Sequence, residues 1–167
     1  FKYLINVDIS KHFIIFTALH YNIYAMAEND NGKSERIVTK MFENDAFSRW
    51  LGISILEVLP GKVSLSLIVR KEFTNGFGVA HGGITYSLAD SALAFSANGL
   101  GRHALSIETS VSHTRPVMEG DILTAHVEEL VNSRKLGIYH INIYNQRSEL
   151  VALFKGTVFK KDAEWDV

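Results

Sequence analysis

The longest uninterrupted apolar pattern of the chain lies near its middle. Residues 84 to 95 are almost wholly apolar and rich in good helix formers, and a glycine-rich turn, residues 75 to 83, precedes them. A helix that is apolar on every side is typical of a helix that is buried on every side. We therefore expect a buried central helix that begins at the glycines and ends near the Asn-Gly-Leu-Gly of residues 98 to 101.

Alternating apolar and polar residues predict strands on both sides of this helix. Two are expected before it and four after it, at residues 53–58, 63–69, 104–114, 122–131, 136–144 and 150–160. Pro60-Gly61 provides a turn between the first two. In the third strand, one side is predicted to carry Leu105, Ile107, Thr109 and Val111, and the other Ser106, Glu108, Ser110 and Ser112. One buried helix with consecutive strands indicates an α+β fold, an antiparallel sheet wrapped around the helix.

The pattern before residue 53 is less regular. Apolar residues recur at helical spacing from residue 37 to residue 50, where we expect Asp45 to cap a second short helical turn and Gly52 to end it. The polar residues 28–35 are typical of a solvated N-terminus. The apolar residues 13–16 are too few for a membrane-spanning helix, which needs about 18 or more.

Residues 1–25 are interpreted as an extension that precedes a natural start at Met26. Ala25-Met26-Ala27 also resembles the small-residue end of a signal peptide, although the apolar stretch before it is short and broken. This interpretation divides the chain into an N-terminal extension (1–40), one folded domain (41–162) and a C-terminal tail (163–167). We expect removal of residues 1–25 to leave activity and melting temperature nearly unchanged.

Composition narrows the classes of function. The chain has 167 residues, 47% of them hydrophobic and 21% charged, which is ordinary for one globular domain. A net charge of -1 indicates neither nucleic acid nor an anionic membrane as a partner. The chain has no cysteine, so disulfides, cysteine–zinc sites and thiol nucleophiles are excluded, and a cytoplasmic location is expected. The histidines lack metal-ligand spacing, and neither a Gly-x-Ser-x-Gly elbow nor a phosphate loop is present, so we expect no metal and no cofactor.

Asp90 is the most informative residue of the central helix. An ionised carboxylate that loses water without a partner is costly, so an acid in an apolar helix indicates a use for it. Gly82 and Gly83, at the start of the same helix, would leave free backbone N–H groups that point at a bound molecule. Gly83 and Asp90 are two helical turns apart, about 10 Å. If both act on one bond, they must come from two copies of the chain.

Three short segments together carry a resemblance. Asn75, His81-Gly82-Gly83 and Leu88-Ala89-Asp90, at this spacing, resemble the signature of the hotdog-fold acyl-CoA thioesterases, and among them the phenylacetate-degradation thioesterase family. The similarity covers about residues 44 to 160, and it includes Leu51-Gly52, Arg115-Pro116 and Gly120-Asp121. His-Gly-Gly alone is a weak signal, but the Asn before it and the Asp after it make the pattern specific. Residues 1–25 resemble nothing in that family.

The resemblance implies a hotdog fold, hydrolysis of acyl-CoA thioesters, and a homodimer or homotetramer with its active sites at the subunit interface. It assigns the N–H that binds the thioester oxygen to Gly82, and the nucleophile or general base to Asp90 of the partner subunit. Asn75 and His81 would position the thioester and the water. Further substrate-binding candidates are Gly83, Ser106, Phe77 and Arg115.

Each of these residues also has a structural interpretation. His81 is equally suited to capping the helix, Asn75-Gly76 forms turns in any context, and the Asp90 carboxylate could be merely solvated. Two other functions stay open: a hotdog hydratase or dehydratase, and a non-catalytic acyl-CoA binding or sensor module. The acyl group is not specified, because Phe77, Tyr86 and Phe95 suit an arylacetyl group and a medium-length chain equally well.

Overall fold

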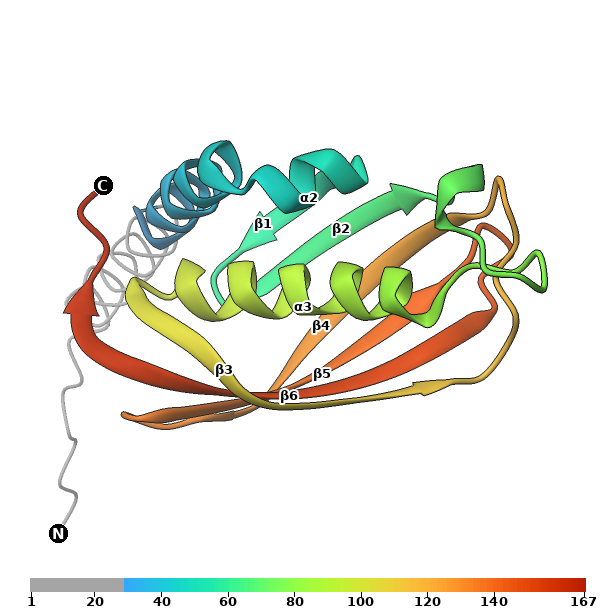
Figure 1. Cartoon of the computed structure of the whole chain (residues 1–167). Helices are drawn as coiled ribbons and strands as arrows, with labels where there is room; N and C mark the ends of the chain where they lie inside the picture. Colours follow the sequence, from blue (N-terminus) through green and yellow to red (C-terminus); the bar gives the residue numbers. More distant parts are fainter. Residues whose placement is uncertain (1–28) are drawn as a thin grey trace, which may run out of the picture.

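A six-stranded antiparallel sheet curves around one long helix (Figure 1). The computed structural model describes residues 29–167. The strand order is β1-β2-β4-β5-β6-β3, so that β1 and β3 form the two edges. The strands are β1 (Ser54–Leu59), β2 (Lys62–Ile68), β3 (Arg102–His113), β4 (Ile122–Asn132), β5 (Leu136–Tyr144) and β6 (Leu150–Glu164). The α+β arrangement and all six predicted strands are confirmed, with β6 extending four residues beyond its expected end.

The central helix α3 (Gly82–Gly99) lies across the concave face of the sheet (Figure 1). Its sheet side carries Leu88, Ala89 and Ala92, which are completely buried in the hydrophobic core. Gly156 of β6 allows the close approach of helix and sheet, because a Cβ there would lie 2.4 Å from a methyl carbon of Leu93.

The prediction that α3 is buried on every side is wrong. Gly83 is exposed, and Ser87, Asp90 and Ala94 on the same side of the helix are only half-buried. These residues repeat at three- and four-residue spacing, so they form one continuous stripe along α3. The sheet therefore covers one face of the helix and leaves this stripe accessible in the single chain.

Two helical segments precede the sheet. Residues 29–44 are helical, and Asp45 then caps α2 (Ala46–Leu51) by accepting the N–H of Ser48 at 2.9 Å. Gly52 ends α2 in the left-handed conformation, with φ of 77°, as predicted. The polar residues 28–35 were expected as a solvated N-terminus. Residues 29–35 are instead part of a helix, and buried Ser34 donates a hydrogen bond to the carbonyl of Gly99. Ile37 and Val38 are fully buried, so packing begins before the expected domain start at residue 41.

Strand β3 does not alternate as predicted, because it contains a β-bulge between Ser106 and Glu108. A bulge places two residues opposite one partner, so the faces exchange beyond it. Ser106 pairs with buried Val158 and shares the helix-facing side with Thr109 and Val111, whereas Leu105 lies on the other face with Glu108.

The C-terminal end of α3 is tied to the rest of the fold by Asn98. Its amide nitrogen donates to the carbonyls of Ala94 and Ala104, at 2.9 and 3.0 Å. Its oxygen accepts the N–H of Ala104 and the indole N–H of Trp165, both at 2.9 Å. Residue 165 was expected in a separate tail, and it packs here against the end of the helix.

Over residues 29–167, no helix is long and apolar enough to cross a membrane. The expectations for residues 1–25 lie outside the described residues.

Candidate active site

The start of α3 is built by His81 and two glycines. His81 is the N-cap, and its Nδ1 accepts the N–H of Gly83 at 3.1 Å, while its carbonyl accepts the N–H of Ile84 at 2.9 Å. The capping interpretation of His81 is thus realised in the structure. The N–H of Gly82 comes directly before these two bonded amides, and no group within residues 29–167 accepts it. A helix start with an unused N–H attracts a partly negative oxygen, and the helix dipole strengthens the attraction.

Asp90 lies two turns further along α3, on the stripe that the sheet leaves uncovered. Its side chain is half-buried, and its oxygens make no hydrogen bond or ion pair within the described part of the chain. Burial raises the pKa of the Asp90 carboxyl above its ordinary value, because the charged form loses water. A hydrogen bond from a water or a substrate would therefore stabilise the ionised carboxylate of Asp90.

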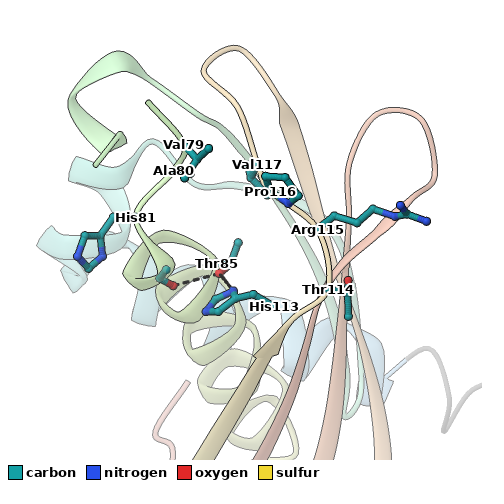
Figure 2. Close-up of a pocket in the computed structure, with 10 residues that line it drawn as sticks. Val79, Ala80, His81, Thr85, His113, Thr114, Arg115, Pro116 and Val117 are labelled. Carbon is teal, nitrogen blue, oxygen red and sulfur yellow. Dashed lines mark hydrogen bonds between the residues drawn. The ribbon is translucent and has the colours of Figure 1, made fainter. Parts of the chain in front are cut away.

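A cavity of about 330 Å³ opens between the start of α3 and the segment that follows β3 (Figure 2). Gly82 and Thr85 line it from the helix, and His113 and Arg115 line it from the opposite side. Figure 2 shows the ring of His81 on the other side of the helix start, pointing away from Thr85 and His113. The unused N–H of Gly82 thus belongs to a helix terminus that has a cavity beside it.

Thr85 links the His113 ring to the start of α3. The Thr85 hydroxyl donates to the carbonyl of Gly82 at 3.0 Å, and the same oxygen lies 3.2 Å from Nδ1 of His113. Because the Thr85 hydroxyl has one proton, both contacts are hydrogen bonds only when Nδ1 of His113 is the donor in the second. In the neutral ring, Nε2 then carries the lone pair. A Cβ on Gly82 would lie 2.9 Å from this Nε2, so a larger residue at position 82 would force the ring or the helix start to move.

The other predicted site residues are distributed around this point. Arg115 is exposed and lines the cavity. The side-chain oxygen of Asn75 accepts the N–H of Phe77 at 2.9 Å, which makes Asn75 part of its own turn. Phe77 is 92% exposed at the tip of that turn. Ser106 is also exposed; it lies on the helix-facing side of β3 and does not line the cavity.

Thr85 and His113 were not recognised as site residues from the sequence. His113 stood among histidines with no characteristic spacing, and Thr85 looked like one polar residue in an apolar helix. They meet only because the end of β3 lies beside the start of α3, which is a tertiary relation that no local pattern encodes.

The model of one protein family, described as the thioesterase superfamily, matches residues 77–152 of the chain. Among curated proteins, a putative esterase of Archaeoglobus fulgidus is 36% identical over 131 residues, which are 78% of this chain and 85% of that protein. The acyl-coenzyme A thioesterase PaaI of Escherichia coli is 37% identical over 116 residues, 70% of this chain and 83% of its own. Human acyl-coenzyme A thioesterase 13 is 30% identical over 115 residues, 66% of this chain and 81% of its own.

Solved structures agree with the sequence matches. The PaaI protein from the phenylacetic acid degradation operon of E. coli superposes with a TM-score of 0.78 at 33% identity, covering 80% of this chain and 97% of that one. A hypothetical thioesterase from Streptococcus pneumoniae, solved with coenzyme A, gives 0.71 at 25% identity over 75% of this chain and 98% of its own. The hotdog fold expected from the resemblance is confirmed.

Proposed function

We propose that this chain, which belongs to the thioesterase superfamily, hydrolyses the thioester bond of acyl-coenzyme A to give free coenzyme A and a carboxylic acid. The observation that carries the reaction is the unused N–H of Gly82 at the start of α3, beside a cavity. As water or a carboxylate attacks the thioester carbon, negative charge develops on the carbonyl oxygen. A preorganised backbone donor stabilises that charge by about 2.7–4 kcal/mol.

Asp90 supplies the second group that the reaction needs. As a general base, it takes a proton from water while the water oxygen bonds to the thioester carbon; the carbon–sulfur bond then breaks and the thiolate leaves as coenzyme A. As a nucleophile, its oxygen bonds to the thioester carbon, the carbon–sulfur bond breaks and the thiolate leaves, and water then hydrolyses the acyl anhydride and regenerates the carboxylate. Both routes require the ionised carboxylate. Its raised pKa makes it a better base than an ordinary aspartate, and activity should disappear as pH falls through that raised value.

The acid and the donor of one site come from two subunits in this proposal. Gly82 and Asp90 are too far apart on one helix to meet at a single carbonyl. Strand β3 is an edge of the sheet, and no strand within residues 29–167 pairs with its outer side. It also exposes Leu105 (57%) and Ile107 (60%). Antiparallel pairing of β3 with its copy would bring the uncovered stripes of two α3 helices together. We therefore propose a homodimer as the active unit, with a dimer of dimers as the larger assembly.

A cationic cavity at the other end of β3 supports the proposal that the substrate is a polyanion such as an acyl-coenzyme A. Arg102, Arg134 and Lys160 line this cavity, which has a volume of about 480 Å³. Lys160 is 4% exposed, and its amino group donates to the side-chain oxygen of Asn132. In an antiparallel β3 pair, the start of one strand lies beside the end of the other, so these cations of one subunit would face His113 and Arg115 of the other. Guanidinium and ammonium groups suit the phosphates of the coenzyme.

The acyl group is proposed to be arylacetyl or medium-chain aliphatic, in keeping with the E. coli protein from the phenylacetic acid degradation operon. Asn75 and Ser106 are proposed to contact the thioester once the dimer forms. The test is incubation of the purified protein with a panel of acyl-CoAs and a thiol reagent. Release of free coenzyme A supports hydrolysis, binding without release indicates a sensor, and hydration of an enoyl-CoA without thiol release indicates a hydratase.

Mixed dimers test the shared site. Chains with Asp90→Asn are mixed with chains in which Gly82 is replaced by a bulky residue, after which subunits are exchanged. Each parent lacks both sites, whereas a mixed dimer keeps one site that is complete. Recovery of activity supports the shared site, and full activity in a strictly monomeric fraction contradicts it.

A further inference from the structure

A second cavity lies on the opposite side of the α3 start from the His113 cavity. It has a volume of about 340 Å³ and lies between α2, the short 3-10 helix η1 (Lys71–Phe73) and the first turns of α3. We call it the aromatic pocket, because Phe47, Trp50 and Phe73 contribute three of its walls. Gly83 and Ser87 line it from α3. His81 lines both this pocket and the His113 cavity, so the start of α3 separates the two.

The aromatic walls are held in position although two of them are open to solvent. Phe47 and Trp50 are 55% and 60% exposed, and their rings stack with centroids 6.1 Å apart. Trp50 also contacts buried Phe73 at 5.9 Å. The guanidinium of Arg70 lies 4.4 Å from the Phe73 ring centre, and it donates a hydrogen bond to the carbonyl of Trp50. A ligand therefore meets an aromatic surface that is already assembled.

One cavity has polar and charged lining residues and the other has aromatic ones, which matches the polar and apolar arms of an acyl-CoA thioester. One arm of an acyl-CoA is the pantetheine chain, which contains amide groups and leads to phosphates. The His113 cavity offers it a ring nitrogen, the Thr114 hydroxyl and the Arg115 cation. The other arm is the acyl group, which is apolar. The aromatic pocket offers it three rings, and apolar surface removed from water there stabilises binding.

We propose that the aromatic pocket binds the acyl group of the substrate, and that Phe47 and Trp50 determine the size and shape of the acyl group that is accepted. This inference rests on the proposed thioesterase function. The thioester carbonyl would lie at the Gly82 N–H, with the pantetheine arm in the His113 cavity and the acyl arm in the aromatic pocket. The ligand class is an apolar acyl group larger than acetyl, either a linear chain or an aryl-substituted one.

The first test compares acyl groups of increasing size. Each methylene that enters the pocket is expected to raise kcat/KM about fourfold until the pocket is full. Trp50→Ala and Phe47→Ala should each lower kcat/KM for octanoyl-CoA and phenylacetyl-CoA by about tenfold, while acetyl-CoA changes less than twofold. Ser87→Leu, which places a larger side chain in the pocket, should shorten the longest linear chain that is accepted. Comparison of octanoyl with phenylacetyl in the wild type then separates a pocket for chains from a pocket for rings.

Phe159→Ala is the matched control. Phe159 is a partly exposed aromatic residue (40%) on the sheet face that points away from α3, so its removal should leave the acyl-size profile unchanged. An equal loss for acetyl-CoA and octanoyl-CoA in the Trp50 and Phe47 variants would overturn the proposal, since it would indicate a structural role without acyl selectivity.

A binding test separates this proposal from the proposed function. Indole fluorescence is recorded in the Asp90→Asn background, which prevents turnover. Octanoyl-CoA or phenylacetyl-CoA should shift the emission, coenzyme A alone should not, and Trp50→Phe should abolish the shift. An emission shift together with no hydrolysis by the wild type would support acyl binding in the aromatic pocket and contradict the thioesterase function. Hydrolysis with no acyl-dependent Trp50 signal would support the thioesterase function and contradict acyl binding in the aromatic pocket.

Discussion

The two halves of helix α3 differ in how fully their polar groups are hydrogen-bonded. At the C-terminal end, both polar atoms of the Asn98 side chain are used, in bonds to Ala94, Ala104 and Trp165. No buried side-chain nitrogen or oxygen within residues 29–167 lacks a partner. In the N-terminal half, the N–H of Gly82 is free and the Asp90 carboxylate has no hydrogen-bond partner in that same range.

Under the proposed function, this difference separates residues that stabilise the fold from residues that act on the substrate. An unpaired polar group beside a cavity costs stability unless a bound molecule completes it. Asn98 completes its own bonds and belongs to the fold. Under the proposed function, the free N–H of Gly82 and the carboxylate of Asp90 are available to the substrate or the water. Changes at one end should therefore alter catalysis, and changes at the other end should alter stability.

Asp90→Asn should have the largest effect, a loss of kcat by about a thousandfold or more, because the variant keeps volume and loses the base or nucleophile. Its effect on stability should have the opposite sign. The pKa of Asp90 is higher in the folded than in the unfolded chain, so the wild type loses stability as pH rises through the folded value, and the variant does not. The variant should melt higher at neutral pH, and this difference should shrink in acid. Near wild-type kcat in the folded variant would show that Asp90 is structural.

Gly82→Ala keeps the backbone N–H but should displace it, and kcat/KM should fall by up to about 100- to 1,000-fold, the effect of losing one oxyanion donor. The added Cβ would lie 2.9 Å from Nε2 of His113, so the helix start or the ring must move. Gly76→Ala is the control, because a Cβ at Gly76 meets nothing within 4 Å. Combining Gly82→Ala with His113→Ala should restore part of the activity, and no recovery would indicate that the clash is not the cause.

Asn98→Ala should act at the other end, with a loss of about 3 kcal/mol in the free energy of unfolding, since it leaves the N–H of Ala104 and the indole of Trp165 unpaired. That loss corresponds to a melting temperature lower by roughly 10 °C. Asn98→Asp keeps the acceptor and should lose less. Thermal unfolding measures both variants, and kcat per folded enzyme should stay within about twofold of the wild type. A large fall in kcat would remove the distinction between the two ends.

Thr85→Val should have the smallest effect, a fall in kcat/KM of about fivefold, equal to the loss of one ordinary hydrogen bond. The change keeps the shape of the side chain and removes the hydroxyl that fixes the His113 tautomer. The pH profile of kcat/KM should change with it, and Thr85→Ser should restore the wild-type profile. An unchanged profile in Thr85→Val would mean that the His113 tautomer does not matter to the reaction.

The sequence predicted the elements that depend on local patterns. Period-two alternation placed every strand, and Asp45 and Gly52 marked the ends of α2 because capping chemistry is local. The bulge in β3 was not predictable, since it depends on the register with β6. The coverage of α3 was overestimated, because the apolar composition of the helix does not tell which of its faces the sheet covers.

The candidate site was predictable in part. Spacing alone placed Asp90 two turns from the glycines, and the family resemblance added Asn75 and His81. His113 and Thr85 were missed, because their hydrogen bond joins the end of one strand to the start of a helix that precedes it. The aromatic pocket was missed for a similar reason. Phe47 and Trp50 fitted the apolar face of a helix, and only the structure shows them more than half exposed.

The place of β3 in the sheet has a consequence for synthesis on the ribosome. Within the described sheet, β3 pairs with β6 alone, and residues 114–149, which include β4 and β5, are translated between the two. A nascent chain that has reached the end of β5 therefore carries an unpaired β3 and an α3 that lacks its contacts with β6. The unpaired β3 edge can pair with another nascent chain in that interval. Conditions that lengthen the interval before β6 can pair with β3 should therefore promote misassembly on polysomes.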